Sequence, residues 1–306
     1  MCAKGRVCYT DKDLANLRLQ YTMPLLCYWR GDNYHRDLDM GAGYHLNQSN
    51  PLLHKIEVGD SLWAFTRSRD GIYVLAAELI VKAKTINPPN FRYGKYRVWG
   101  DINYSRYFQV KNQPSIENVL RSLSCKTNAR ILGLSFQGFS AVKLISQKDA
   151  EMLRMLAAEL PLEERARILS EDKLEAMLLL EDVKAVKNLV RDEKPGIAEE
   201  RRIYFYRQAP ARNKNLVEEL QEIYSGRCQI CQWSPRNVYG KELCHGHHIQ
   251  WLSRGGADEL TNMVLVCPNH HAAIHKLDAP LDFVDFSFNF GAHRETLSLR
   301  GHLEAV

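Results

Sequence analysis

The first part of the chain alternates polar and apolar residues in the manner of β-strands. Residues 60–67 alternate, residues 68–71 have the composition of a turn, and residues 72–82 form a second apolar run, so we expect a β-hairpin. Residues 96–110 are rich in Tyr, Val and Phe and predict further strands. We therefore expect a β-rich domain over residues 1–145.

Apolar residues take helical spacing further along the chain. Residues 115–123 and residues 171–191 carry apolar side chains three and four positions apart, which predicts a helix in both places. Ser146 and Asp149 are typical of a helix cap. Residues 146–200 are rich in charged side chains without a sustained heptad, so we expect a helical connector there rather than a dimerising coiled coil.

The last third of the chain predicts a helix, two strands and a second helix. Residues 215–224 have helical spacing, and residues 242–249 and 260–267 are typical of short strands separated by a loop. Pro268 suits the first position of the helix that follows. We expect this ββα unit to form a domain over residues 201–306. The whole chain is therefore predicted to be an α+β protein.

The composition is that of an ordinary protein of two domains. The chain has 306 residues, of which 45% are hydrophobic and 25% charged, and it contains no apolar run long enough to predict a membrane span. The first residues lack the apolar segment of a secretory signal. Four cysteines are scattered through the first half without a pairing rhythm, namely Cys2, Cys8, Cys27 and Cys125. These features predict a cytoplasmic protein with free thiols.

Charge is distributed unevenly along the chain, whose net charge is +5. Residues 1–145 carry 20 Lys and Arg against 11 Asp and Glu, whereas residues 146–200 carry 9 against 14. A basic N-terminal half is typical of proteins that bind a polyanion such as nucleic acid, although many solvated surfaces are mildly basic.

Two pairs of candidate zinc ligands lie in the last third of the chain. Within each pair, two residues separate the ligands, so that a tight turn can direct both side chains at one ion. Four nitrogen and sulfur ligands complete a closed tetrahedral shell, which is typical of structural zinc. The four ligands predicted for this zinc are Cys228, Cys231, Cys267 and His270.

The motifs between residues 213 and 277 resemble those of the HNH nucleases, whose fold is the ββα-metal finger. The matching motifs are CxxC at 228–231, HHI at 247–249, a GG loop at 255–256, TN at 261–262 ahead of an apolar strand, and CPNHH at 267–271 followed by His275. Their combination is specific, although each piece alone is not. The resemblance implies a nuclease, and we expect one of the restriction type.

The resemblance also implies a role for each matched residue. His248 would be the general base that takes a proton from the attacking water. Asn262 would brace the loop so that the His248 ring keeps its orientation. His247 and His271, with His275 as a third ligand, would hold a divalent metal such as Mg²⁺ or Mn²⁺ at the scissile phosphate.

Elementary chemistry agrees with these roles. Phosphodiester hydrolysis needs an activated water and a counter-charge for the developing anion. An imidazole with an ordinary pKa of about 6.5 accepts a proton at neutral pH. Neighbouring residues of a strand point to opposite faces, so His247 can be a metal ligand while His248 is the general base.

One position departs from the commonest pattern, because the second zinc pair ends in His270 rather than in cysteine. His270 and His271 could exchange roles, and the two-residue spacing from Cys267 assigns His270 to zinc. Cys244 and His245 are competing ligands, but they lack a partner at short spacing. The alternative for the whole cluster is a purely structural zinc finger with extra surface histidines.

Aromatic side chains gather in the N-terminal half. Residues 1–145 contain 18 of the 29 aromatic residues, interleaved with Lys and Arg. Such a mixture suits stacking on bases beside phosphate contacts, and it equally suits a β core. Residues 28–32 and 58–63 weakly resemble PUA-like or EVE-type domains, small β barrels of which some bind modified bases. A base turned out of the duplex would then enter an aromatic pocket, for which the candidates are Trp29, Trp63 and Trp99.

These observations together predict a metal-dependent endonuclease that hydrolyses DNA phosphodiester bonds. A domain that binds modified bases, joined to an HNH unit, would make it a modification-dependent restriction enzyme. The alternatives are a zinc-dependent nucleic-acid-binding module without catalysis, and an RNase or homing nuclease with the same chemistry. Cutting both strands needs two active sites, which a homodimer would supply, and no membrane partner is expected.

Overall fold

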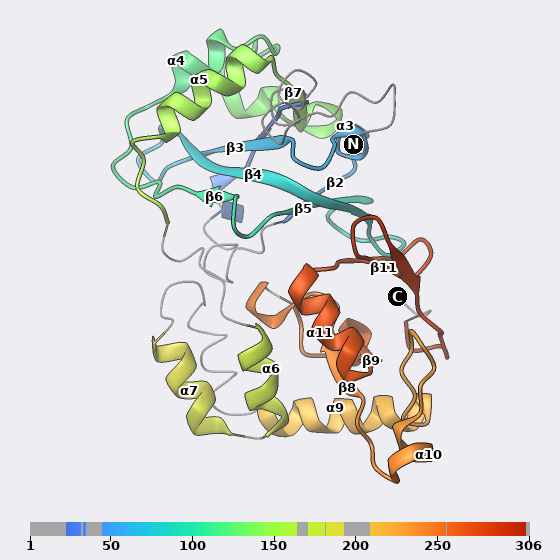
Figure 1. The fold of residues 1–306 in the computed structure, drawn as a ribbon. Helices are drawn as coiled ribbons and strands as arrows, with labels where there is room; N and C mark the ends of the chain where they lie inside the picture. The colour runs from blue at the N-terminus through green and yellow to red at the C-terminus, as the bar shows by residue number, and fades with distance from the viewer. Residues whose placement is uncertain are drawn as a thin grey trace, which may run out of the picture.

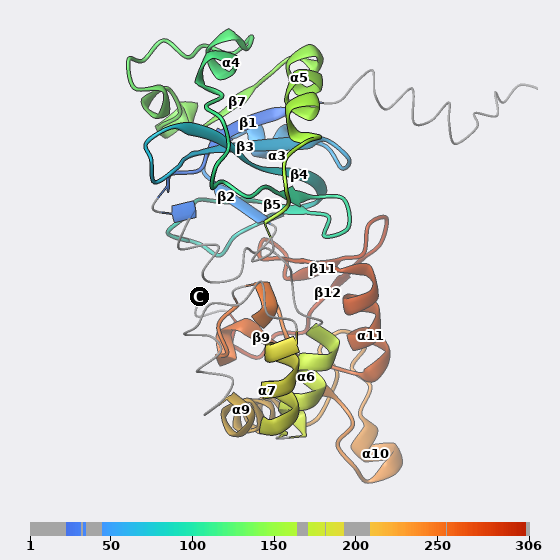
Figure 2. The ribbon, with the colours of Figure 1, turned by 90° about the vertical axis from the view of Figure 1, so that its left-hand side faces the viewer.

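A computed structural model shows two units, a β-sheet with helices on one face and a mainly helical unit beside it (Figures 1 and 2). The fold is α+β, as the sequence predicts. The described residues are 23–31, 33–34, 45–163, 171–180, 182–192, 209–254 and 256–303. None of the helices in these ranges is both long and apolar enough to cross a membrane.

One long strand organises the N-terminal sheet, whose order is β2-β5-β4-β3-β1-β7 with β6 beside β4. The strands are β1 (Leu25–Tyr28), β2 (His45–Gln48), β3 (Ser61–Arg67), β4 (Tyr73–Ile86), β5 (Tyr96–Gly100), β6 (Arg106–Tyr107) and β7 (Val142–Leu144). β4 pairs with β3 and β5 in turn, and its ladders shift register between Ala64 and Phe65 and between Val81 and Ala83. Such bulges bend a strand. The path from β2 to β7 does not close among the described strands.

The predicted hairpin is formed by β3 and β4, which pair antiparallel. In the turn, Ser68 N donates to Ile72 O at 2.8 Å, and Gly71 N donates to Ser68 O at 3.0 Å. Gly71 has a φ of 83°, a conformation that glycine adopts without steric strain. The composition of the turn therefore predicts its position correctly.

Helices cover one face of this sheet (Figure 1). The helical elements of the unit are α3 (Leu52–Lys55), α4 (Glu117–Ser122), η1 (Leu132–Ser135), η2 (Gly138–Ser140) and α5 (Gln147–Ala157). The predicted cap of α5 is confirmed: Asp149 N donates to Ser146 Oγ at 3.1 Å, and Ser146 N donates to Asp149 Oδ2 at 2.9 Å. Leu153 of α5 lies in one apolar cluster with Trp63 and Phe65 of the sheet. Thus α5 packs into the N-terminal core.

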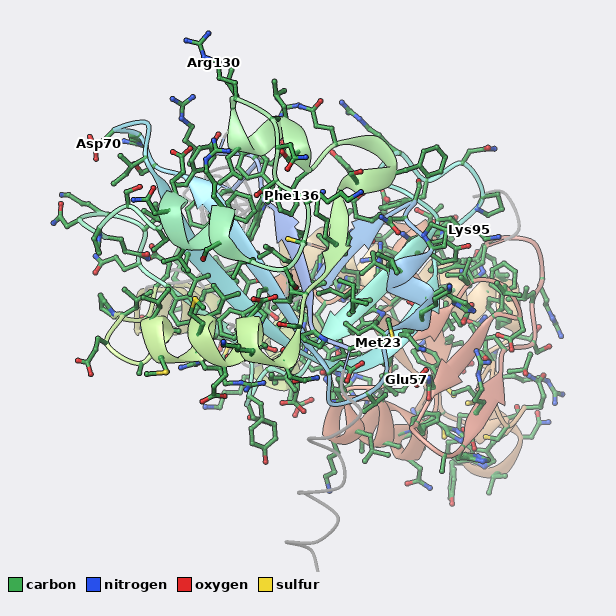
Figure 3. All side chains as sticks on the ribbon, turned by 90° about the horizontal axis from the view of Figure 1, so that it is seen from above. Met23, Glu57, Asp70, Lys95, Arg130 and Phe136 are labelled. Atoms are coloured by element: carbon green, nitrogen blue, oxygen red, sulfur yellow. The ribbon has the colours of Figure 1, made fainter. Side chains whose placement is uncertain are left out.

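Aromatic packing fills the rest of this core. The Phe136 ring is buried and lies 4.9 Å from the Phe65 ring in a T-shaped contact. Figure 3 shows Phe136 inside the unit, whereas Asp70 and Arg130 project at its edge. The β core that the sequence offered as the alternative to base stacking therefore accounts for a large share of the aromatic residues.

The C-terminal unit is built around a two-stranded ribbon. Its elements are α6 (Glu171–Leu179), α7 (Val183–Asp192), α9 (Ala209–Tyr224), α10 (Pro235–Tyr239), β8 (His245–His248), η4 (Leu252–Arg254), η5 (Leu260–Asn262), β9 (Met263–Val266), α11 (Pro268–Leu277), β10 (Leu281–Asp282), β11 (Ser287–Asn289) and β12 (Arg294–Thr296). β8 and β9 pair antiparallel, and both α9 and α11 contact them. The predicted ββα unit is confirmed, with Pro268 at the start of α11.

One helical prediction needs correction. The expected helix over residues 171–191 is two helices, α6 and α7, because Asp182 interrupts the run. Its carboxylate accepts a hydrogen bond from Ala185 N at 2.8 Å, which is the geometry of a new helix start. The break predicted at residues 194–196 lies outside the described residues, as do Cys2 and Cys8.

The two units touch at the end of β4. Lys82 Nζ lies 3.1 Å from Asp278 Oδ2, and Phe283 N donates to Ile86 O at 3.2 Å. Asp278 Oδ1 also lies 2.7 Å from a guanidinium nitrogen of Arg254. Asp278 therefore joins a lysine of the sheet to an arginine of the C-terminal unit.

We predict that Leu153→Ala destabilises the N-terminal unit, because the Leu153 side chain is fully buried in its core. The loss should be about 2–5 kcal/mol of unfolding free energy, measured by urea denaturation. Met155→Ala on the same helix is the matched control, since Met155 is 71% exposed and should shift stability by less than about 0.5 kcal/mol. Equal losses from both variants would contradict the packing of α5.

Candidate metal and catalytic centre

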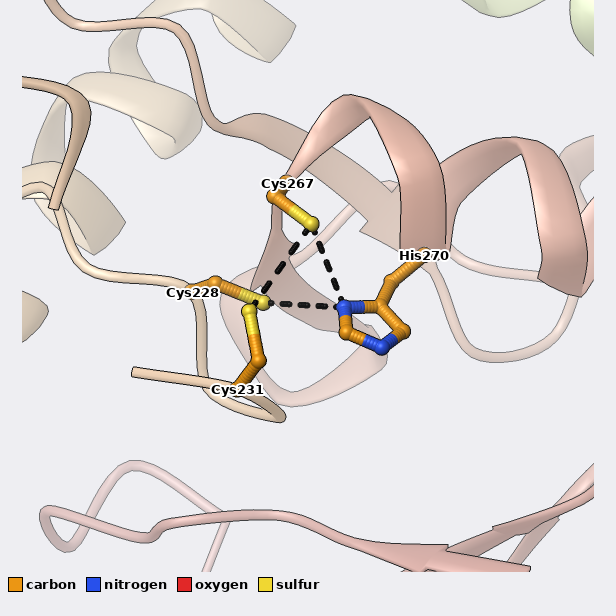
Figure 4. A group of neighbouring side chains, drawn as sticks. All are labelled: Cys228, Cys231, Cys267 and His270. Atoms are coloured by element: carbon orange, nitrogen blue, oxygen red, sulfur yellow. Dashed lines mark hydrogen bonds between the residues drawn. The ribbon is translucent and has the colours of Figure 1, made fainter. Parts of the chain in front are cut away.

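Three thiols and one imidazole converge where β9 meets α11 (Figure 4). Cys267 Sγ lies 3.2 Å from His270 Nδ1, Cys228 Sγ lies 3.5 Å from the same nitrogen, and Cys231 Sγ lies 4.0 Å from Cys267 Sγ. Ligands about 2.0–2.3 Å from one ion are separated by roughly 3.3–3.8 Å in a tetrahedron. The donor set and its spacing can therefore hold zinc, whereas Cys244 and His245 lie outside this group.

Backbone hydrogen bonds and a neighbouring carboxylate position the side chains of this group. Gln232 N donates to Cys228 O at 2.9 Å and closes the turn between the first two thiols. Cys267 caps α11, which places His270 in the first helical turn. Glu295 Oε2 lies 3.1 Å from His270 Nε2, so that a carboxylate orients the ligand ring from behind.

A second cluster of imidazoles comes from the neighbouring faces of β8 and α11. The ring centroids of His247 and His271 are 5.4 Å apart, those of His247 and His275 are 4.7 Å apart, and those of His271 and His275 are 4.5 Å apart. His271 and His275 are one helical turn apart and share a face of α11. A carboxylate oxygen of Glu175 and one nitrogen from each ring lie within 4.8 Å of one another.

The His247 ring fits a metal ligand. It is fully buried, and neither of its nitrogens has a hydrogen bond in the described part of the chain. The nearest carboxylate oxygen, on Glu175, is 3.7 Å from Nδ1. Burial lowers the pKa of His247 to about 4, although Glu175 counteracts the shift, so the ring is neutral and keeps a free lone pair. Buried polar atoms without partners are rare, and coordination of an ion would give the free lone pair of His247 a partner.

His248 lies between two carboxylates. Its Nε2 is 2.9 Å from Asp258 Oδ1, and its Nδ1 is 3.2 Å from Glu175 Oε1. Burial alone would lower the pKa of His248, but the hydrogen bonds to Asp258 and Glu175 outweigh it and raise the pKa to about 10. In this arrangement His248 is protonated, which differs from the neutral imidazole that the sequence suggests.

Asn262 ties the loop between the two strands. Its Oδ1 accepts from Gln250 N at 2.8 Å, and its Nδ2 donates to Gln250 O at 2.9 Å and to Ala257 O at 2.7 Å. Gly256 is needed in the same loop, because a Cβ at this position would overlap the carbonyl oxygen of Gln250. The loop thus holds Asp258 against His248.

Residues 228–277, which contain both clusters, match the family model described as HNH endonuclease. The chain belongs to the HNH endonuclease family. A curated relative, "Anaredoxin" from Nostoc sp. (strain PCC 7120), is 31% identical over 77 residues, which are 25% of this chain and 93% of that protein.

Among solved structures, the chain is similar to the Type IV phosphorothioation-dependent restriction endonuclease ScoMcrA, at 14% identity and a TM-score of 0.20. The match covers 81% of this chain and 50% of that one, so the chain spans about half the length of that protein. A TM-score this low supports no shared arrangement.

Sequence reasoning missed three acidic residues around the HNH site. Glu171 and Glu175 belong to α6, far ahead of the motif, and helical spacing alone marks them as residues of a solvated face. Asp258 stands in the loop after the GG motif, and no spacing rule connects it to His248. Only the folded chain brings these three residues to the histidines. The one usable signal in the sequence was that Glu171 and Glu175, four residues apart, share a face of the predicted helix.

The three tryptophans proposed for base binding occupy different places. Trp29 lines a cavity of about 1090 Å³ in the N-terminal unit. Trp63 is fully buried in the core of the sheet, and Trp99 is buried beside Thr85, to which its indole N–H donates at 2.8 Å. Neither Trp63 nor Trp99 lines the cavity, so Trp29 is the candidate that remains.

We predict that Cys228→Ala removes zinc from the HNH unit and unfolds it at lower temperature, because the binding free energy of a structural metal is also folding free energy. Metal content by mass spectrometry and calorimetric unfolding check the result. Cys244→Ala is the matched control: this thiol is buried nearby but lies outside the ligand group, so zinc content should stay unchanged. Zinc retained by the Cys228 variant would contradict the assignment.

Proposed function

We propose that this chain is a metal-dependent endonuclease that hydrolyses DNA phosphodiester bonds. The observation that carries the proposal is the convergence of His247, His271 and His275 beside His248 in a unit that matches the HNH family. Three imidazoles leave open positions for water and phosphate, as in catalytic metal sites. A purely structural zinc finger would not need this second cluster.

Each residue of the site has a separate task in the proposal. His247, His271 and His275 would hold a divalent ion such as Mg²⁺ or Mn²⁺, which when bound neutralises charge on the scissile phosphate. His248 takes the proton of the attacking water once its ring is free. Asp258 stabilises the resulting imidazolium at Nε2, and Asn262 keeps the loop in place. The four ligands of the other cluster hold a structural zinc.

The second part of the proposal is that the N-terminal unit, a PUA-like β domain, binds a modified base of DNA. Its cavity is lined by Trp29 and by the half-exposed Tyr93, and Phe139, which is 93% exposed, stands at the same cavity. Buried Arg97 also lines it and donates to Asn47 Oδ1 at 2.7 Å. Aromatic faces with convergent polar groups suit a base turned out of the duplex.

The position of the cavity connects it to the nuclease. Gln250 and Arg254, both in the HNH loop, contribute to its wall beside the sheet residues. A base held there would bring its own DNA backbone toward the HNH unit. This supports a modification-dependent restriction enzyme acting on DNA in the cytoplasm, with a homodimer supplying two cuts where both strands are cleaved.

The proposed domain division follows the packing. We propose that the N-terminal unit includes α5 and extends to about residue 163 rather than to the predicted 145, because α5 residues share its apolar core. The segment containing α6 and α7 contacts α9, so we assign it to the nuclease side of the former connector.

We predict that His248→Ala reduces nicking of supercoiled plasmid in Mg²⁺ or Mn²⁺ by at least about 100-fold, because the proton acceptor is lost. Agarose gels over time give the rate, and zinc content with thermal unfolding checks the fold. His54→Ala is the control, since His54 is exposed in the N-terminal unit and outside both clusters. Full activity in the His248 variant would remove this residue as the base.

We also predict that cutting depends on base modification and on Trp29. Digestion of methylated, hydroxymethylated and unmodified copies of one DNA should yield cuts in a modified copy only. Trp29→Ala should weaken binding to that copy by about 1–3 kcal/mol, the value of one stacked base. Tyr104→Ala is the aromatic control, because Tyr104 is 71% exposed and does not line the cavity. Equal cutting of all copies would reject modification dependence and leave the nuclease intact.

A further inference from the structure

A helix from outside the HNH motif covers the catalytic cluster. α6 lies beside the ββα unit in both views (Figures 1 and 2) and contacts α9. Two of its acidic side chains are almost fully buried, Glu171 at 2% and Glu175 at 3% exposure, and so are Leu174 and Leu178. Carboxylates are rarely buried to this extent unless they are paired, so their partners define what α6 does.

Glu175 lies where the three imidazoles of the site converge. Its Oε2 lies 2.8 Å from His271 Nε2 and 2.9 Å from His275 Nε2, and its Oε1 lies 3.7 Å from His247 Nδ1. One of its oxygens thus completes a four-donor group with the three histidines. A shell closed by four protein ligands is typical of a structural metal, whereas catalysis needs one position open.

The same carboxylate also engages the proposed base. With Glu175 at Nδ1 and Asp258 at Nε2, both ring nitrogens of His248 face carboxylate oxygens. Ionised carboxylates only accept hydrogen bonds, so the ring has no free lone pair for a proton from water. The His248 ring is therefore complete in hydrogen bonds and unable to start the reaction.

Glu171 fastens the helix to the loop of the nuclease. Its Oε1 accepts from Leu252 N at 2.7 Å, and its Oε2 accepts from Ser253 N at 3.0 Å. These two amides lie between Gln250 and Arg254, which line the cavity of the N-terminal unit. Because Glu171 and Glu175 are four residues apart, one face of α6 makes both contacts.

We propose that α6 is an autoinhibitory helix: Glu175 stands in for a phosphate oxygen of DNA at the three-histidine site, Glu171 latches the helix to the loop, and cutting requires α6 to leave. The inference rests on the proposed function of the site. The proposal is incompatible with Glu175 as a permanent ligand of the catalytic metal, because in that role the carboxylate would help catalysis.

The test uses Glu171→Gln and Glu175→Gln in the full chain. If the open state of the unaltered chain is populated at about 0.1–10%, release should raise apparent DNA affinity by about 10- to 1000-fold. Fluorescence anisotropy with a modified duplex, in buffer without Mg²⁺ or Mn²⁺ and without a chelator that would remove the structural zinc, measures this without cutting. Glu218→Gln removes the same charge from an exposed position on α9 and controls for reduced repulsion of DNA.

Nicking rates in Mg²⁺ complete the comparison. Faster nicking and tighter binding by both variants, but not by the Glu218 variant, are the expected result. Unchanged affinity in the absence of Mg²⁺ and Mn²⁺ together with slower nicking would overturn the proposal and make Glu175 a working ligand. If the variants bind DNA more tightly but neither they nor the unaltered chain nick it, the proposed catalysis would be rejected and the inhibitory helix kept.

A measurement on the unaltered chain guards against variants that fail to fold. α6 has 9 residues, and isolated helices this short are unstable in water, so undocking should melt it. Addition of the modified duplex without Mg²⁺ or Mn²⁺, with the structural zinc left in place, should increase hydrogen exchange at the α6 amides by about tenfold or more while the buried amides of α9 stay protected. Unchanged protection of α6 in the DNA complex would overturn the proposal.

Discussion

The arrangement of the C-terminal unit depends on one buried negative charge among imidazoles. Burial alone would raise the pKa of Glu175, yet its interactions with the imidazole of His247 and hydrogen bonds from the surrounding rings hold it well below its usual range. An unpaired buried carboxylate would be very costly, so the position of α6 relative to β8 and α11 is fixed by electrostatics as well as by its apolar face. A cation in the same place would be coordinated by the imidazoles instead. The Glu175 carboxylate and a catalytic ion would therefore either exclude one another from this space or occupy it together.

The group of three cysteines and His270, which can hold zinc, lies beside this cluster and supports it. A ribbon of two four-residue strands is not stable alone, and β8 and β9 gain their stability from α9, α11 and the metal ligands around them. His270 and His271 are consecutive on α11, about 100° apart around the helix axis, so one ring faces the structural group and the next faces the catalytic group. The distance between the two clusters is therefore fixed by covalent geometry.

Short-range patterns in the sequence predict much of this molecule. The β3–β4 hairpin, the α5 cap and the ββα unit follow from turn chemistry, capping and alternation, all of which act over a few residues. The convergence of the three cysteines and His270 follows from spacing in the same way. Contacts over long separations were not predictable: the hydrogen bonds of Glu175 to His271 and His275 span 96 and 100 residues. Nor was the burial of Trp63, since an alternating strand shows which side chains share a face but not what covers that face.

The loop between β8 and β9 contacts every part that the proposed function requires. Gln250 and Arg254 line the cavity, Leu252 and Ser253 bind Glu171, and Asp258 holds His248. The three hydrogen bonds of the Asn262 side chain, two to Gln250 and one to Ala257, tie the two ends of this loop together. Coupling between distant sites needs an element with two arrangements that both sites bias. The docked and released positions of α6 would be those arrangements, and occupation of the cavity would bias them through the two amides that hold Glu171.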